Sequence, residues 1–364
     1  MAAKKKKGNR IFGITSRVLM LIVAALLALS YLSIVVNPAK IWVVSLSGIL
    51  FVPLMTVNLL LLLWALKRRS GSFIIPLLAL LPSLFFLGRY VQFRSDEEMP
   101  VAGTGSTVRI LTWNVGRFAM QDADAGVTDI AQCVDSIFSF IRQEDPDIIC
   151  LQEFSVAASE PVREYLKRKF AGYTAEYYLF PEKQRSSGNV TLSRLPVTGK
   201  GKIKFEESAN LAIYTDHSSG ERSFRVYNCH FESYNISLTG LVRAVADRDS
   251  TVVAQTGTKV KRSITRRPRQ VDQVFEDIEN CRLPSFVCGD FNDNPMSYTY
   301  YRMTRGRKDA FVEAGEGFGA TYSLLWPMLR IDYVLYPEDG RAVSYEIPRL
   351  PYSDHYPVIT EIEL

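Results

Sequence analysis

Acidic, amide and imidazole side chains stand where several apolar segments of this chain end. The segment FVCGDFND (286–293) places Asp290 and Asn292 directly behind an apolar run. Glu153 ends the apolar run IICLQE, and His230 ends FRVYNCH. Carboxylate and amide oxygens are ligands of hard divalent cations, and histidine exchanges protons near neutral pH. Gathered at one edge of a sheet, such side chains could hold a cation and transfer a proton.

Further residues of the same types occupy similar positions. Asn114 ends TWN, Asp332 lies in RIDYV, and Asp354 and His355 form part of SDH. Taken singly, each residue has an ordinary interpretation as a turn former, a half-exposed acid or a core histidine. The chain has only three histidines, however, and two of them lie beside such positions. The third, His217 in TDHSSGER, is expected to lie in a solvated turn.

The elements that must position these residues alternate between strands and helices. Apolar and β-branched runs predict strands at 108–115, 148–154, 175–180, 189–197, 210–216, 223–231, 285–291, 331–336 and 355–364. Helical periodicity predicts helices at 129–142 and 270–280. Strands interleaved with helices predict an α/β (α+β) architecture of layered sheets.

The first hundred residues have a different character. Three apolar runs, 11–36, 41–66 and 73–93, are each about as long as a membrane-spanning helix, which needs roughly 20 apolar residues. They predict a membrane domain over residues 1–94, with a polar linker at 95–106. The first run is too long for the apolar core of a cleaved signal peptide, which is the competing interpretation.

Charge orients the three predicted spans. The basic segment KKKKGNR precedes the first span, and the basic segment KRRS joins the second span to the third. Cationic segments stay in the cytoplasm, so the N-terminus is expected there. Three crossings of the inner (plasma) membrane then place the C-terminal domain outside the cytoplasm. The third run contains two prolines and Arg89, so it could instead enter the bilayer without crossing it. In that case the C-terminal domain would stay in the cytoplasm.

The basic character of the chain belongs to its N-terminal part. Residues 1–100 hold 12 Lys and Arg against three acids; subtracting these from 43 and 38 leaves 31 basic and 35 acidic residues in 101–364. This mildly acidic part lacks the footprint of nonspecific nucleic-acid binding. Its most basic stretch, KVKRSITRRPR (259–269), is either a solvated face or a clamp for an anionic substrate. No CxxC pair is present, which argues against a structural zinc site.

The order TWNV, LQE, NCHF, GDFND, RIDYV and SDH resembles the endonuclease/exonuclease/phosphatase superfamily, a DNase I-like group, over about residues 107–364. The resemblance implies a four-layer sandwich of two mixed β-sheets flanked by helices. It also implies hydrolysis of phosphoesters with a divalent metal, Mg²⁺ or Mn²⁺. The inositol 5-phosphatase signature PAWCDR has no counterpart, since this chain reads LWPMLRIDYV.

The resemblance also implies roles for single residues. Glu153 matches the principal metal ligand, helped by Asn114, with Asp354 next to the metal or the phosphate. Asp290 and Asn292 match the pair that contacts the phosphate and the attacking water. The remaining roles are the general acid for His230, the second histidine for His355 with Asp332 orienting its ring, and phosphate binding for Asn189 in SSGNVTLSRLPV.

These observations lead to one main hypothesis and two alternatives. The main hypothesis is a membrane-anchored, metal-dependent phosphoesterase that acts on a phosphoester substrate such as the headgroup of a membrane lipid. The first alternative is a metal-dependent nuclease, which the acidic C-terminal part does not favour. The second is a catalytically silent binding protein on the same scaffold, which predicts the loss of at least one polar position.

Overall fold

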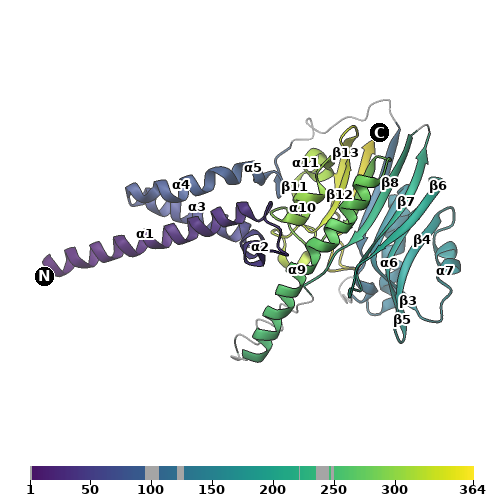
Figure 1. Ribbon diagram of the computed structural model, residues 1–364, viewed down its shortest axis with the longest axis horizontal. Coiled ribbons are helices and arrows are strands. Elements are labelled where there is room, and N and C mark those ends of the chain that lie inside the picture. The colour runs from purple at the N-terminus through teal and green to yellow at the C-terminus, as the bar shows by residue number, and fades with distance from the viewer. Residues whose placement is uncertain (1, 95–105, 121–126, 221, 235–245, 247–249) are drawn as a thin grey trace.

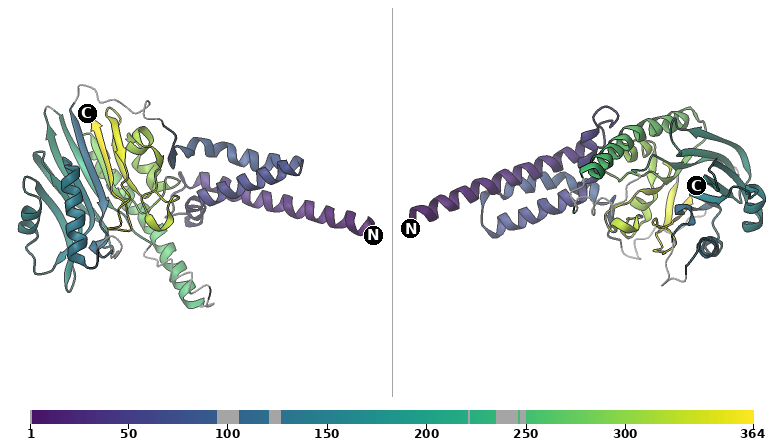
Figure 2. Two further views of the ribbon diagram at one scale, coloured as in Figure 1. Left: turned by 180° about the vertical axis from the view of Figure 1, so that it is seen from behind. Right: turned by 90° about the horizontal axis from the view of Figure 1, so that it is seen from below.

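The computed structural model describes residues 2–94, 106–120, 127–220, 222–234, 246 and 250–364. A group of N-terminal helices extends from one side of a β-sandwich, as Figure 1 shows. The two further views in Figure 2 show the same arrangement, with the N-terminal end of α1 farthest from the sheets. The predicted linker at 95–106 lies outside the described residues except for Ser106.

The sandwich consists of two six-stranded sheets. The first has the order β13 (Arg341–Glu346), β14 (Val358–Glu363), β2 (Thr107–Asn114), β3 (Ile148–Ala157), β5 (Arg185–Ser193) and β4 (Thr174–Pro181). The second has the order β10 (Arg307–Asp309), β12 (Asp332–Pro337), β9 (Ser285–Asp290), β8 (Arg222–His230), β7 (Leu211–Ser219) and β6 (Val197–Lys204). Each sheet contains one parallel pair, β2–β3 in the first and β8–β9 in the second, and its other pairs are antiparallel. Both sheets are therefore mixed, as predicted.

Alternation along the strands builds the layers, because successive side chains point to opposite faces. Ile110 and Cys150 of the first sheet pack with Val226 and Cys288 of the second in a fully buried inner core. The intervening residues of the first sheet pack on α6 (Ile130–Glu144) and α7 (Val162–Lys169). Those of the second sheet pack on α9 (Ser250–Asn280) and α10 (Tyr298–Met303). The predicted four-layer sandwich is confirmed.

One expectation about local structure is incomplete and one is wrong. The helix predicted at 270–280 is present, but it begins at Ser250 and so includes the whole basic stretch 259–269. Within that stretch Arg267 is buried and lies 3.1 Å from Asp293, so the stretch is not simply a solvated face. His217 is fully buried in β7 rather than solvated, because the strand continues to Ser219.

The N-terminal unit comprises five α-helices in the described residues: α1 (Ala2–Leu32), α2 (Trp42–Ile49), α3 (Phe51–Lys67), α4 (Ile74–Leu80) and α5 (Leu84–Leu87). Short 3-10 turns, η1 (Gly71–Phe73) and η2 (Leu81–Ser83), join the last three helices. One described segment, Ile14–Leu32, is long and apolar enough to span a membrane, with a mean hydropathy of 2.0. The pair α2 and α3 qualifies together but bends by 61°, and Gly71–Leu87 is shorter. Three complete spans thus remain a prediction.

Noncovalent contacts, besides the chain connection, hold the N-terminal unit to the sandwich. Strand β1 (Val91–Gln92) pairs with β11 (Gly317–Phe318), which follows the short helix α11 (Ala310–Ala314). Met296, from the loop after β9, is buried among Leu27, Phe51 and Tyr90 of the N-terminal unit.

Candidate active site

Strand direction brings the polar residues of both sheets to one edge. Asn114 and Glu153 lie toward the carboxyl ends of the parallel pair β2 and β3, and His230 and Asp290 end the parallel pair β8 and β9. Strand β12 runs antiparallel to β9 and starts opposite Asp290, so Asp332 reaches the same edge. Strand β14 runs antiparallel to β2, with Val358 opposite Thr112. This register puts the preceding Asp354 and His355 at that edge as well.

A β-bulge directs Glu153 into the site. The register of β3 against β5 shifts between Leu151 and Phe154, and Glu153 adopts a left-handed φ of 51°. Its side chain is 32% exposed, the most open of the carboxylates that converge here from β3, β9 and β12. A bulge with an uncommon backbone conformation re-aims a side chain and often marks a functional position.

Asp290 is the most heavily bonded carboxylate of the site. It is 1% exposed. Its Oδ1 accepts a hydrogen bond from the backbone N–H of Asn292 at 2.7 Å. Its Oδ2 accepts from Asn292 Nδ2 at 3.0 Å and from Asn114 Nδ2 at 2.9 Å. These bonds satisfy a buried carboxylate that would be costly if it were unpaired.

Asn114 bridges the two sheets through its amide. Besides Asp290, its Nδ2 contacts Glu153 Oε1 at 3.4 Å. Its Oδ1 accepts from the backbone N–H of Gly116 at 3.0 Å, which fixes the orientation of the amide. Asn114 therefore stands beside Glu153 as expected, with its donor atoms rather than its carbonyl oxygen turned toward the carboxylates.

His355 and Asp332 form a buried pair. The ring atom Nδ1 lies 2.9 and 3.2 Å from the two oxygens of Asp332, and Nε2 lies 3.8 Å from Asp290 Oδ2. Burial alone lowers the pKa of His355, but the carboxylates of Asp332 and Asp290 outweigh it and raise this pKa to about 10. Burial also raises the pKa of Asp332, against the charge of His355. The pair therefore keeps a proton at neutral pH.

His230 completes the cluster from the second sheet. Its Nε2 lies 3.7 Å from both Glu153 Oε1 and Asp290 Oδ2. This atom is buried and has no hydrogen-bond partner among the described residues. Buried polar atoms are normally hydrogen-bonded, so Nε2 is available to interact with a bound ligand. Asp290, Asp332 and His355 each offer a ligand atom within 4.8 Å of the others. The oxygen-rich donor set and the unpartnered imidazole fit a hard divalent cation.

Two predicted residues, Asp354 and Asn189, make their described hydrogen bonds outside the carboxylate cluster, so their predicted roles stay predictions. The backbone carbonyl of Asp354 accepts from Ser323 N and Oγ, and its carboxylate faces the turn at Gly116. Asn189 is fully buried between the sheets, where its Nδ2 donates to the carbonyls of Leu211 and Asn228. No described contact joins Asn189 to the carboxylate cluster, so its phosphate-binding role stays a prediction.

Sequence reasoning missed two residues that border the site. Arg117, in the 3-10 turn η4 (Gly116–Phe118), lies 3.7 Å from Glu153 Oε2 and is half exposed. The ring of Tyr322 meets the ring of His355 edge-on, with centroids 5.2 Å apart. The cation three positions after Asn114 in WNVGR was a usable signal for Arg117. Tyr322 could not be found, because only tertiary packing brings it to His355.

Comparison with known proteins agrees with this geometry. A sequence model of the Endonuclease/Exonuclease/phosphatase family matches residues 111–355. A second model, described as a domain of unknown function, matches residues 9–90. No curated protein matches the chain.

Several solved structures share the fold of the sandwich. One is an endonuclease/exonuclease/phosphatase from Beutenbergia cavernae, with a TM-score of 0.52, 21% identity, and coverage of 71% of this chain and 72% of that chain. The human Nocturnin catalytic domain with bound sulfate anion has a TM-score of 0.51, 18% identity, and coverage of 71% and 94%. A Bacteroides thetaiotaomicron mannosyl-6-phosphatase has a TM-score of 0.50, 16% identity, and coverage of 71% and 100%. The family model, the shared fold and the converging polar residues agree that this chain belongs to the endonuclease/exonuclease/phosphatase family.

Proposed function

We propose that the chain is a membrane-anchored, divalent-metal-dependent phosphoesterase whose catalytic domain spans residues 107–364. The observation that carries the proposal is the convergence of Glu153, Asp290, His230 and His355 from both sheets. Each histidine places its Nε2 within 3.8 Å of Asp290 Oδ2. Burying two carboxylates and two imidazoles at one sheet edge costs free energy. Catalysis explains this arrangement better than a role in binding alone.

The donor set suggests how a cation would be held. Glu153 would hold Mg²⁺ or Mn²⁺ together with Asp290, since Asn114 Nδ2 lies 3.4 Å from Glu153 Oε1 and 2.9 Å from Asp290 Oδ2. The ion would neutralise charge on the phosphoryl oxygens. The guanidinium of Arg117, beside Glu153 and half exposed, is placed to bind a phosphate oxygen. Asn292 keeps Asp290 in position through its two hydrogen bonds.

The two histidines divide the proton transfers. Asp332 accepts from Nδ1 of His355, which fixes the ring and leaves Nε2 to face the site. Since this pair keeps its proton, His355 is suited to donate a hydrogen bond to a phosphoryl oxygen or a proton to the leaving group. The unpartnered Nε2 of His230 is the second group available for proton transfer to or from water.

We assign the substrate to the membrane surface. Tyr322 and Ser323 contact His355 and Asp354, and the loop that continues from them carries exposed Leu324, Trp326 and Met328. This loop begins at the 3-10 turn η5 (Ser323–Leu325). Exposed apolar side chains beside a site favour contact with an apolar surface.

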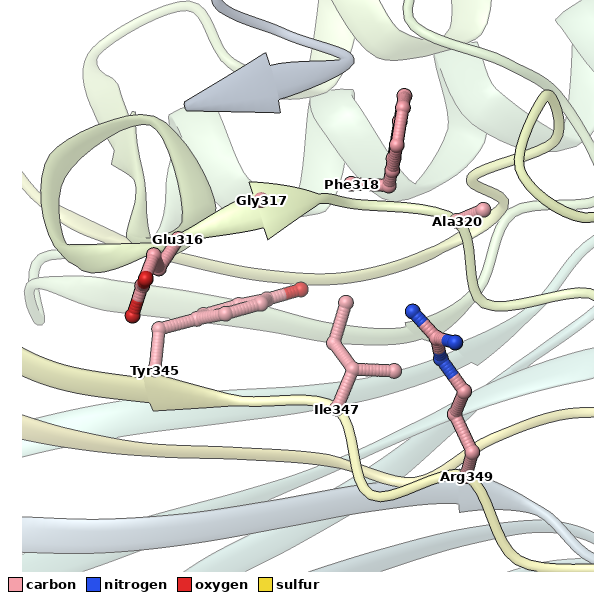
Figure 3. A pocket seen from close by; sticks show the side chains of 7 residues that line it. All are labelled: Glu316, Gly317, Phe318, Ala320, Tyr345, Ile347 and Arg349. Atoms are coloured by element: carbon pink, nitrogen blue, oxygen red, sulfur yellow. The ribbon is translucent and has the colours of Figure 1, made fainter. Parts of the chain in front are cut away.

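Cationic groups accompany these apolar side chains. The Arg349 guanidinium lies 4.1 Å from the Trp326 ring. It also lines a pocket of about 220 Å³ with Phe318 and Tyr345, shown in Figure 3. On the basic stretch of α9, Lys261 lies 5.5 Å from the ring of Trp42 in the N-terminal unit. Cations beside aromatic rings at the end of apolar helices suit the headgroup region of a bilayer. A phospholipid phosphoester is therefore the substrate we favour.

Turnover by the full-length protein tests the proposal. We expect hydrolysis of bis-p-nitrophenyl phosphate that EDTA abolishes and that His355→Ala lacks, and release of headgroups from phospholipid vesicles faster than nicking of plasmid DNA. Trp326→Ser should slow vesicle turnover but leave bis-p-nitrophenyl phosphate hydrolysis intact. Plasmid nicking without lipid turnover would instead establish the nuclease, and a lack of metal-dependent turnover on any phosphoester would establish the silent binding protein. Mannose 6-phosphate belongs in the screen, because one protein of this fold is a mannosyl-6-phosphatase.

The side of the membrane needs a separate experiment. We propose an inner-membrane protein with its catalytic domain outside the cytoplasm, supported by the distribution of basic residues in the N-terminal part. C-terminal fusions to alkaline phosphatase should be active, and fusions to green fluorescent protein should be dark. The reverse pattern would place the catalytic domain in the cytoplasm.

A further inference from the structure

The loop after β9 contacts both the active site and the N-terminal unit. Its first residues belong to the site, since Asn292 bonds Asp290 and the carbonyl of Phe231. Its next residues pack against the N-terminal unit: Met296 is buried among residues of that unit, and Arg89 contacts the carbonyl of Pro295 at 3.4 Å. A single residue, Asp293, separates Asn292 from the first residue that contacts the helices.

The partner of this loop is the α2–α3 elbow, which we define as residues 48–51. Asn294 is buried, and its Nδ2 donates to the carbonyl of Gly48 at 3.0 Å and contacts that of Ile49 at 3.5 Å. Carbonyls in the last turn of a helix lack intrahelical partners, so Asn294 caps the C-terminal end of α2. Its Oδ1 accepts from Met296 N at 2.9 Å, which fixes the orientation of the amide.

The elbow and the loop approach too closely for any side chain at residue 48. A Cβ on Gly48 would lie 2.3 Å from Met296 O and 2.4 Å from Ser33 Oγ. Ser33, just past the end of α1, itself contacts Met296 O at 2.6 Å and is buried. Backbone thus packs on backbone, and a shift of the elbow must move the loop.

We propose that the α2–α3 elbow is a positioning element of the active site, so that the N-terminal unit helps to shape the metal site as well as anchoring the enzyme. This inference rests on the proposed metal-dependent function. The elbow holds residues 294–296 and thereby the backbone of Asn292, whose left-handed φ of 51° needs outside support. Asn292 in turn orients Asp290, whose Oδ2 lies within 3.8 Å of the Nε2 atoms of both histidines.

The elbow is one of two supports of this loop. From the catalytic side, Asp293 is held by Arg267 at 3.1 Å, and its carbonyl accepts from Tyr333 Oη at 2.9 Å. Because this second support remains when the elbow is disturbed, we expect a partial loss. Residues that orient metal ligands typically contribute about 10-fold to 100-fold in affinity, and the lower end applies here.

Gly48→Ala tests the inference in the full-length protein. Alanine favours a helix more than glycine does, but its Cβ would push on Met296 O and Ser33 Oγ. If the unit served only as an anchor, this local shift would leave Mn²⁺ affinity unchanged. We expect Gly48→Ala to weaken Mn²⁺ binding about 10-fold, measured by electron paramagnetic resonance, and to raise the Mg²⁺ concentration for half-maximal turnover by a similar factor. Gly71→Ala is the matched control, because a Cβ there meets nothing within 4 Å.

Two further variants keep the test decisive if Gly48→Ala fails to fold. Ser33→Ala removes the hydroxyl that faces Met296 O without adding bulk. Asn294→Asp can still accept from Met296 N but opposes the carbonyls of the elbow with a charge. Mn²⁺ affinity equal to that of Gly71→Ala in the variants that fold would overturn the inference. A wild-type protein that neither binds Mn²⁺ nor turns over would overturn the proposed function instead.

Discussion

His217 gives the catalytic domain a pH-dependent stability that can be measured. The ring is fully buried, with Nδ1 3.1 Å from Ser193 Oγ and Nε2 2.7 Å from Thr215 Oγ1. Burial lowers the pKa of His217 to about 4, against the opposing charge of Asp216. The ring is therefore neutral in the folded protein at pH 5, whereas in the unfolded chain it is protonated below a pKa of about 6.5.

The sign and size of the effect follow from these two pKa values. Between pH 6.5 and 4 the unfolded chain binds more protons than the folded protein, so stability falls as the pH falls through this window. Above pH 6.5 both states are neutral at His217, and the contribution to stability is fully present. The complete shift corresponds to about 3 kcal/mol, of which about 2 kcal/mol is already lost at pH 5.

His217→Gln isolates this contribution, because the amide offers a donor and an acceptor but does not titrate. We expect the wild type to lose about 2 kcal/mol more than the variant between pH 7.5 and pH 5 in urea unfolding followed by tryptophan fluorescence. Thr215→Val is the control: it removes one partner of the ring but keeps the titrating histidine, so the pH dependence should persist. Equal pH dependence in the wild type and His217→Gln would refute the reasoning.

Other predictions concern the site and its surroundings. Glu153→Gln should weaken Mn²⁺ binding at least about 10-fold in calorimetry with an unchanged circular dichroism spectrum; unchanged affinity would remove Glu153 from the metal site. Asp332→Asn should lower kcat by about 10³-fold to 10⁴-fold with little change in KM, since the ring of His355 loses its partner, and near-native kcat would show that the pair is only structural. Asp309→Ala should cost about 3–5 kcal/mol in denaturant unfolding, because it leaves the buried guanidinium of Arg330 without its two bonds of 3.0 and 2.7 Å; a cost below about 1 kcal/mol would mean that water replaces the carboxylate.

Much of the fold could be predicted because local signals and tertiary structure agree in the sandwich. Asp129 is an expected start for α6, and its side chain accepts from Gln132 N at 2.9 Å. Apolar residues at helical spacing, Val134, Ile137 and Ile141 among them, then lie buried against the first sheet. Polar residues at strand ends predicted the edge where the site forms, since neighbouring parallel strands end on the same side.

The remaining features depend on contacts between distant segments. The β-bulge at Glu153 leaves no mark in IICLQEF, because it arises from the pairing of β3 with β5. The burial of His217 depends on Ser193 and Thr215, which supply its hydrogen bonds across the sheet. The hydrogen bond from Asn294 to the carbonyl of Gly48 joins residues 246 positions apart. Neither local segment, NDNP (292–295) or LSGI (46–49), predicts this contact.

Backbone strain occurs at three positions of the site, which supports a functional origin. Among the described residues of the catalytic domain, six that are not glycine have a positive φ: Arg117, Glu153 and Asn292 at the site, with 59°, 51° and 51°, and Phe118, Asp145 and Glu207 elsewhere. This conformation costs roughly 1–2 kcal/mol for most residues and less for asparagine. Glycine at position 153 would relieve the strain in β3, but it would also remove the carboxylate that faces His230. A fold under selection for stability alone would favour that glycine, so the glutamate is better explained by what its side chain does than by what its backbone prefers.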